Sequence, residues 1–197
     1  MSSSSPARER ILDAAATVLN QRGVAGATTR ELARAAGYSE GMLYKYFSDK
    51  QELFLAVLSE RMPRIELPEA SDRSDLPSSL ESIVTALLVY FTRTFPLSVS
   101  IFSTPDLLAE HRDGVRGHGA AGPEGVVPLV VNLLVEEQAT GRIRADADLE
   151  AAAHLLVGLA FHRAFIAAYE GDMEVMDASD FAARGIRLVV PSLEPTD

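Results

Sequence analysis

The sequence predicts an all-α protein built from two helical domains. Helix start and stop signals recur along the first 62 residues, and apolar side chains repeat at helical spacing in both halves of the chain. Between the halves, residues 64–79 are rich in proline, serine and charged side chains, which is typical of a linker. We therefore expect a three-helix domain over residues 1–62 and a larger helical domain over residues 63–197.

The first expected helix carries apolar residues at helical spacing from Ile11 to Leu19 and ends at Gly23. The next helix begins with Thr28 and Glu31, which fit a capping box because each side chain can satisfy a free backbone N–H at the helix start. These two helices would pack against each other, with the first covering the second and its successor.

A tight turn and a short third helix follow. Gly37 suits the left-handed conformation that ends a helix, and Ser39 can cap the next helix, expected over residues 40–47. Ser48 with Gln51 predicts another capping box, and the helix that it opens should continue until Pro63.

The helix over residues 40–47 has two different faces. Leu43 and Phe47 lie four residues apart and should point inward, which places Gly41 and Lys45 on the outer face. A glycine inside a helix costs about 1 kcal/mol relative to alanine, so Gly41 suggests that a partner approaches the backbone closely. Two short helices joined by a tight turn can place the second one in the major groove of DNA.

Other side chains near this helix could contact the DNA backbone. Tyr44 and Tyr46 can donate hydroxyl hydrogen bonds to phosphates, and Lys45 and Lys50 are the only lysines of the chain. The helix starts at Thr28 and Ser39 present free N–H groups to anions. Glu40 suits the helix dipole but repels phosphate, unless it accepts a hydrogen bond from a cytosine amine.

These residues resemble the N-terminal domain of the tetracycline-repressor (TetR) family of bacterial regulators over about residues 7–62. The family pattern of a threonine-led helix, a glycine turn, Ser-x-Gly-x-Leu-Tyr-x-x-Phe and a lysine is met by Thr28, Thr29, Gly37, Ser39, Gly41, Leu43, Tyr44, Phe47 and Lys50. The resemblance implies that Thr29, Ser39, Tyr44 and Lys50 hold phosphates and that Gly41 and Lys45 face the groove. Tyr46 departs from the family, in which many members carry histidine.

Three other interpretations of the same residues remain open. Residues 37–41 match the G-x-S-x-G nucleophile elbow, which would make Ser39 a hydrolase nucleophile, but that elbow follows a β-strand and a helix is expected here. Tyr44 could be an ordinary core aromatic residue. Lys45 and Lys50 could be solvated surface charges.

Composition limits the remaining choices. The chain has 197 residues and no cysteine, which excludes disulfides and thiolate metal sites. The first ten residues lack the apolar core of a secretory signal, and apolar stretches such as 126–135 fall short of the roughly 20 residues that cross a bilayer, so we expect a cytoplasmic protein without a membrane span. The net charge is −10, but residues 1–62 carry +1 and residues 63–197 carry −11. The acidic half should therefore stay away from DNA.

The second domain should contain several helices. An apolar stripe from Leu80 to Phe91 predicts one that Pro96 ends, and a shorter one is expected over 97–108. The glycine-rich residues 111–125 predict a loop. Further helices are expected over 123–138, over 148–169 and over 179–190, where Pro191 would end the last one.

The TetR resemblance implies a homodimer and a small-molecule pocket in this domain. In the family the last two long helices pack against their copies in a four-helix bundle, for which the candidate residues are Phe161, His162, Phe165, Phe181 and Leu188. The candidate residues for a small hydrophobic ligand are Leu87, Tyr90, Phe91, Phe102, Leu134 and His154, although each is also a plausible core residue. The expected function is that of a repressor that leaves a palindromic operator when the ligand binds. The alternative is a DNA-binding repressor without a ligand.

An enzyme is the remaining class. The chain has no HExxH motif, no phosphate-binding loop and no cysteine nucleophile, and its four histidines are dispersed. His154 and His162 share one helical face but have no third ligand at a clear spacing. We therefore expect no catalytic site, no metal and no cofactor.

Overall fold

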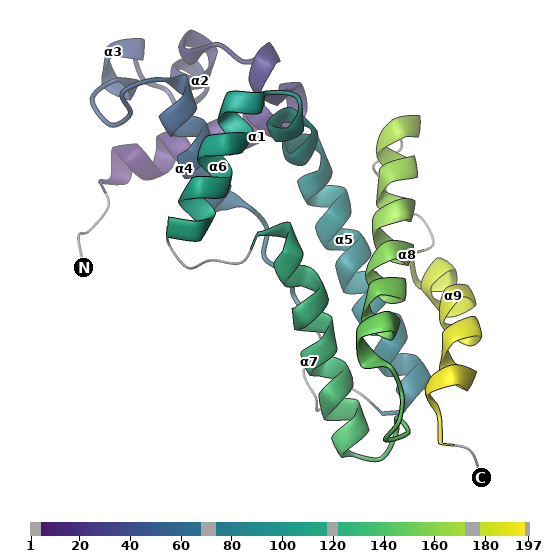
Figure 1. The fold of residues 1–197 in the computed structure, drawn as a ribbon. Helices are drawn as coiled ribbons and strands as arrows, with labels where there is room; N and C mark the ends of the chain where they lie inside the picture. Colours follow the sequence, from purple (N-terminus) through teal and green to yellow (C-terminus); the bar gives the residue numbers. More distant parts are fainter. Residues whose placement is uncertain (1–4, 68–73, 118–121, 172–177, 196–197) are drawn as a thin grey trace. The chain divides into compact units, whose positions relative to one another are not determined.

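The computed structural model describes residues 5–67, 74–117, 122–171 and 178–195, and these residues contain helices but no strand (Figure 1). The expected all-α fold class is confirmed. The elements are α1 (Pro6–Gly26), α2 (Thr29–Ala35), α3 (Glu40–Leu43), α4 (Lys50–Arg61), α5 (Leu76–Phe102), α6 (Pro105–Gly117), η2 (Pro123–Gly125), α7 (Val126–Ala139), α8 (Leu149–Glu170) and α9 (Ala178–Leu193).

The chain divides into two compact units. The first comprises Met1–Pro63 with Pro96–Gly114, and the second comprises Arg64–Phe95 with Val115–Asp197. Residues 96–114 therefore belong to the first unit, whereas the sequence analysis assigned them to the second domain, over residues 63–197.

The core of the first unit holds α1, α2, α3 and α4 together. Its fully buried side chains include Ile11, Leu12, Leu19, Leu32, Leu43, Phe47, Leu53, Phe54 and Val57, and Leu97, Ile101 and Leu107 join them from the ends of α5 and α6. The expected first helix is present, with a kink at Gly23 (φ 68°) after which α1 resumes for three residues.

Two helices continue through a proline that was expected to end them. α5 runs through Pro96 to Phe102, so no separate helix covers residues 97–108. A proline inside a helix costs about 3 kcal/mol, but Leu97 and Ile101 beyond it are buried in the first unit, and this packing outweighs the local penalty. α9 likewise runs through Pro191 to Leu193, which is 3% exposed and whose carbonyl accepts the Arg144 N–H at 2.9 Å.

The expected loop over residues 111–125 is partly wrong. α6 begins at Pro105, a residue type that suits the first helical position, and extends to Gly117. Residues 118–121 lie outside the described residues, and residues 123–125 form a 3-10 turn before α7.

The second unit is built from α5, α7, α8 and α9, which share one apolar core (Figure 1). A buried polar group joins two of these helices: Glu137 of α7 is fully buried, accepts a hydrogen bond from the Ser79 hydroxyl of α5 at 2.7 Å, and pairs with Arg142 at 2.5 Å. Because an unpaired buried carboxylate is strongly unfavourable, these partners fix the end of α7 against α5.

Two helices of the structure reach the length that a membrane span needs, whereas the sequence analysis expected no apolar stretch of that length. α5 has 27 residues and α8 has 22, and by length and hydropathy alone either could cross a bilayer. The match is weak evidence for a span, since core helices of water-soluble proteins meet the same criterion, and both helices supply side chains to the core of the second unit.

Candidate nucleic-acid interface

The start of α2 is fixed by the predicted capping box. The Thr28 hydroxyl accepts the Glu31 N–H at 3.2 Å, and the Glu31 carboxylate accepts the Thr28 N–H at 3.0 Å. These hydrogen bonds, with a smaller contribution from Arg22, hold the pKa of Glu31 below its usual value. The Thr28 hydroxyl also donates to Glu31, so the proton that a phosphate contact would need is already engaged.

The turn between α2 and α3 contains Gly37 in the left-handed backbone conformation. Gly37 has φ 77°, its N–H donates to the Arg34 carbonyl, and the Tyr38 N–H donates to the Ala33 carbonyl at 2.9 Å. This pair of hydrogen bonds is a Schellman motif, which ends α2 and redirects the chain. The Arg10 guanidinium lies 5.3 Å from the centre of the Tyr38 ring, so α1 braces the turn.

α3 is shorter than predicted. Only Glu40–Leu43 are α-helical, and residues 44–46 form a turn in which the Tyr46 N–H donates to the Leu43 carbonyl. A backbone hydrogen bond from Phe47 to Leu43 nevertheless keeps Phe47 below Leu43, and both side chains are buried in the core. The inner face predicted for this segment is therefore confirmed.

The outer face of the same segment is open. Gly41, Tyr44 and Lys45 are exposed, and 49% of the Tyr44 surface is accessible. A Cβ atom added at Gly41 would meet nothing within 4 Å. None of the described residues therefore requires glycine at this position by its packing, and the interpretation of Tyr44 as a core residue is wrong.

Glu40 has a partner inside the site. The Thr29 hydroxyl donates to the Glu40 carboxylate, and the Tyr44 hydroxyl lies 3.5 Å from the Thr29 hydroxyl oxygen. This chain of contacts joins the start of α2 to both ends of α3. Ser39 precedes α3 at the cap position but makes no side-chain cap hydrogen bond, and its hydroxyl is exposed.

The start of α4 differs from the prediction by one residue. Asp49, rather than Ser48, caps the helix by accepting the Glu52 N–H at 2.8 Å, and Glu52 accepts the Ser48 N–H at 2.6 Å. The hydrogen bond from Ser48 lowers the pKa of Glu52. Lys50 is the first residue of α4, whereas the Tyr46 hydroxyl is turned inward and hydrogen-bonded to the Ser5 hydroxyl at 3.0 Å.

Carboxylates of the first unit already pair with several of its cations. Arg8 of α1 is bidentate to Glu60 of α4, with N···O distances of 2.8 and 2.6 Å. Arg61 pairs with Asp13 at 2.7 Å and also with Glu9, and Arg22 pairs with Glu31 at 3.0 Å. The Arg8 guanidinium holds the pKa of Glu60 below its usual value.

The candidate ligand residues do not form one group. Leu87 and Leu134 are fully buried in the core of the second unit, and Tyr90 and Phe91 pack against it. Burial raises the pKa of the Tyr90 hydroxyl. His154 is exposed. Phe102 is 64% exposed and belongs to the other unit, so the structure does not bring it to the rest.

The candidate dimer residues lie on α8 and α9 and are mostly open. Phe161 is 47% exposed, Phe165 45% and Leu188 84%, and His162 is exposed as well. Phe181 is instead half-buried against the core of the unit. Leu155 and Tyr169 of α8 are also exposed, at 63% and 83%, in line with the near-continuous apolar character of residues 149–169.

The phenylalanines of α8 also contact α5. The Phe161 ring lies 5.3 Å from Phe91 and 5.9 Å from Phe95, and Phe165 lies 5.8 Å from Phe95. An aromatic cluster with one buried edge and one open edge thus joins the candidate ligand residues of α5 to the candidate dimer surface of α8.

A family model described as "Bacterial regulatory proteins, tetR family" matches residues 11–57, which span the capped α2, the glycine turn and α3. Residues 11–57 of this chain therefore match the N-terminal region of the tetR family of bacterial regulatory proteins. The nucleophile elbow is therefore excluded for Ser39, which lies between two helices of a helix-turn-helix and follows no strand.

Relatives that match the N-terminal part of the chain are named as transcriptional regulators. It is 40% identical over 81 residues to the HTH-type transcriptional regulator SrpR of Pseudomonas putida, an alignment that covers 41% of this chain and 38% of SrpR. It is 38% identical over 90 residues to the HTH-type transcriptional repressor BepR of Brucella suis, covering 43% of each. The chain thus matches less than half the length of these two relatives.

The fold of the chain also has solved counterparts. FadR of Bacillus subtilis, solved in complex with stearoyl-CoA, has a TM-score of 0.64 at 17% sequence identity, covering 93% of this chain and 98% of FadR. At this identity the likeness concerns the fold.

Proposed function

We propose that this chain is a ligand-responsive transcriptional regulator that binds a palindromic DNA operator as a homodimer. The observation that carries the proposal is the two-sided segment at α3. Leu43 and Phe47 anchor it in the core, and Gly41, Tyr44 and Lys45 face outward from a helix-turn-helix of a regulator family. Such a helix can lie in the major groove with its N-terminal end toward the base edges.

We assign the contacts by the position of each side chain. Lys45 stands on the outer face and would read bases, and Gly41 would let the duplex approach the backbone. Tyr44, Ser39 and Lys50 would contact phosphates. The remaining candidates have internal roles: Thr28 is the cap of α2, Thr29 donates to Glu40, and Tyr46 is bonded to Ser5.

The proposed dimer would use the open apolar surface of α8 and α9. Exposed aromatic and aliphatic side chains at helical spacing are the kind of surface that an obligate interface covers. A two-fold axis through this surface would present two copies of α3 to two half-sites, which makes a palindrome the expected operator.

The proposed ligand is small and hydrophobic, and it would bind beside Tyr90, Phe91 and Phe95, which form the α5 part of the aromatic cluster. FadR of Bacillus subtilis, a fold relative, was solved with stearoyl-CoA, which carries a long acyl chain. Ligand binding would favour a conformation in which the two copies of α3 no longer match the operator, a coupling of typically 1–3 kcal/mol. Such a regulator would act in the cytoplasm as a repressor, without a catalytic site.

A repressor without a ligand is the second candidate. One observation favours it: Leu87 and Leu134, two of the candidate ligand residues, are fully buried and fill the core themselves. Titration of operator-bound protein with fatty acids and acyl-CoA would separate the two candidates. Release of DNA supports the regulated form, and unchanged affinity with every compound supports the second.

The DNA-binding proposal is tested by selecting duplexes from a random pool and measuring affinities by fluorescence anisotropy. Lys45→Ala should change the preferred sequence, and Tyr44→Phe should weaken binding to all duplexes about fivefold, because one hydroxyl hydrogen bond is worth roughly 1 kcal/mol. Arg187→Ala removes an exposed cation of α9 and serves as the control. Unchanged affinity and preference in both Lys45→Ala and Tyr44→Phe would refute the proposal.

A further inference from the structure

Glu40 is the first residue of α3, and none of the proposed DNA contacts uses its carboxylate. The side chain is half-buried, and its Oε1 atom accepts a hydrogen bond from the Thr29 hydroxyl of α2. The Tyr44 hydroxyl lies 3.5 Å from the same Thr29 oxygen. Among the described residues, the second oxygen, Oε2, has no hydrogen-bond or ion-pair partner. One oxygen is therefore held in place, and the other is available to a ligand.

The carboxylate belongs to the side of α3 that would meet the DNA. Leu43, three residues after Glu40, is fully buried, whereas Gly41 and Tyr44 are exposed. The Tyr44 N–H donates to the Glu40 carbonyl, and residues four apart in a helical turn lie on the same side. The first residues of the second helix in a helix-turn-helix contact base edges. Glu40 is therefore placed to meet a base rather than the core.

A carboxylate at a DNA surface weakens binding unless a base compensates for it. Like charges repel, so Glu40 reduces the attraction of this surface for the phosphates of every duplex. The repulsion is offset where a base donates a hydrogen bond to the carboxylate. In the major groove the donors are the N4 amino group of cytosine and the N6 amino group of adenine.

The choice between these two bases follows from the atoms beside each amino group. Adenine places the N7 acceptor next to N6, and a carboxylate, which has acceptors only, would meet the N7 lone pair. Cytosine presents its N4 amino group without an acceptor beside it on its own major-groove edge. A glutamine amide has the opposite preference, because its NH₂ group and its oxygen match N7 and N6 of adenine.

We propose that Glu40 reads a cytosine at one fixed position of each operator half-site. Its Oε2 atom accepts a hydrogen bond from the N4 amino group, and Thr29 positions the carboxylate through Oε1. This assignment rests on the proposed function, since it names the base that α3 recognises. Glu40 contributes specificity rather than affinity, because it repels every duplex that lacks the amino group at that position.

Selection of duplexes from a random pool, by the full chain and by Glu40→Gln, tests the proposal. We expect a cytosine at one position of each half-site for the original chain and an adenine there for Glu40→Gln. Glutamine keeps an oxygen that can accept the Thr29 hydroxyl, so a purely structural role of Glu40 predicts the same selected sequence for both proteins. A selected operator that both proteins share would overturn this proposal alone, whereas failure of the original chain to select any duplex would overturn the proposed function as well.

Deletion of a single amino group from the DNA gives a second measurement, which needs no variant. Replacing the selected cytosine by 2-pyrimidinone removes only N4, and the original chain should bind this duplex at least about fivefold more weakly. Glu40→Ala should bind both duplexes equally, and it should bind duplexes of unrelated sequence more tightly than the original chain because the repelling charge is gone. Fluorescence anisotropy measures these affinities. Equal binding of both duplexes by the original chain would overturn the proposal.

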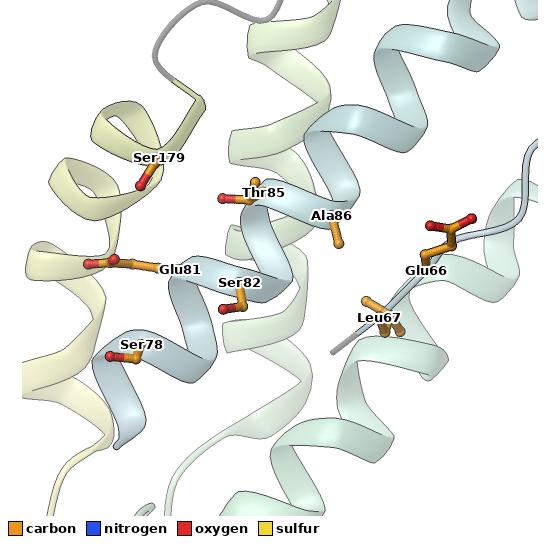
Figure 2. Close-up of a pocket in the computed structure, with 8 residues that line it drawn as sticks. All are labelled: Glu66, Leu67, Ser78, Glu81, Ser82, Thr85, Ala86 and Ser179. Carbon is orange, nitrogen blue, oxygen red and sulfur yellow. The ribbon is translucent and has the colours of Figure 1, made fainter. Parts of the chain in front are cut away.

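Glu81→Gln is the matched control for the loss of one negative charge. Glu81 of α5 is half-buried like Glu40, but it belongs to the second unit, where it lines the pocket shown in Figure 2. Its replacement should leave both the selected sequence and the effect of 2-pyrimidinone unchanged. Equal changes in Glu81→Gln and Glu40→Gln would assign the effect to net charge and overturn the proposal. Thermal unfolding of each variant, followed by circular dichroism, verifies that the helices remain folded.

Discussion

Replacing Gly41 by alanine should separate DNA binding from folding. Gly41 lies in the first turn of α3, and an added Cβ would meet nothing within 4 Å. Because alanine favours a helix over glycine by up to about 1 kcal/mol, the variant should be as stable as the original chain or slightly more stable. A gain of this size would raise the melting temperature by at most about 4 °C.

DNA affinity should change in the opposite direction. If duplex edges approach the α3 backbone, the added methyl group must displace them, and we expect at least a tenfold rise in Kd, which is about 1.4 kcal/mol. Fluorescence anisotropy with a selected operator duplex measures this affinity, and differential scanning calorimetry measures the stability. A more stable protein that binds DNA less tightly is the expected combination.

Two other glycines serve as controls. Gly114 of α6 also has nothing within 4 Å of an added Cβ, so Gly114→Ala should be harmless to both stability and DNA binding. Gly37 has φ 77°, a conformation that costs other residues roughly 1–2 kcal/mol, so Gly37→Ala should be the least stable of the three. Operator affinity of Gly41→Ala equal to that of Gly114→Ala would refute the assignment of the α3 outer face.

Three further predictions concern the dimer, the buried carboxylate and acid stability. Leu188→Glu places a charge on a side chain that is 84% exposed on the proposed interface, so sedimentation velocity should show at least a tenfold weaker dimer. Ser79→Ala removes a donor 2.7 Å from buried Glu137 and should lower the free energy of unfolding in urea by about 1.5–3 kcal/mol, the value of a hydrogen bond to a charged group. Arg8 lowers the folded-state pKa of Glu60, so this stabilisation is complete above the unfolded pKa of about 4.3 and is lost as the pH falls through the folded value. The free energy of unfolding should therefore drop below about pH 4.3, and less steeply in Arg8→Met.

Each of these predictions has a control. Val135→Glu adds the same charge at an exposed apolar position of α7, and an equal effect of both changes on the dimer would argue against the α8–α9 surface. Ser103→Ala removes an exposed serine hydroxyl, and a loss of stability as large as in Ser79→Ala would show that burial of Glu137 is not the cause. Identical acid slopes with and without Arg8 would exclude the ion pair to Glu60 as their source.

The helix-turn-helix could be predicted because its determinants are local. The capping box at Thr28 and the left-handed Gly37 each need only neighbours in sequence, and both are present as expected. The cap of α4 was misplaced by one residue because Ser48 with Gln51 and Asp49 with Glu52 have the same spacing. The carboxylate of Asp49 is the one that accepts the backbone N–H.

The ends of α5 and α9 could not be predicted, because tertiary contacts decide them. Pro96 and Pro191 are strong local signals for a helix end, but the residues beyond each are buried in a core. The same limit applies to the candidate ligand residues. Whether Phe102 shares a site with Tyr90 depends on which unit receives the end of α5, and nothing near Phe102 in the sequence encodes that choice.

The ion pairs of the first unit have a consequence for how operator binding would respond to salt. Of the eight lysines and arginines in residues 1–62, three are already neutralised by carboxylates of the same unit: Arg8, Arg22 and Arg61. Each cation that engages a phosphate releases a condensed counterion and adds about 0.9 to the slope of log affinity against log salt concentration. Because Arg8, Arg22 and Arg61 would add little to this slope, rising ionic strength should weaken the complex less steeply than a count of all eight cations would suggest.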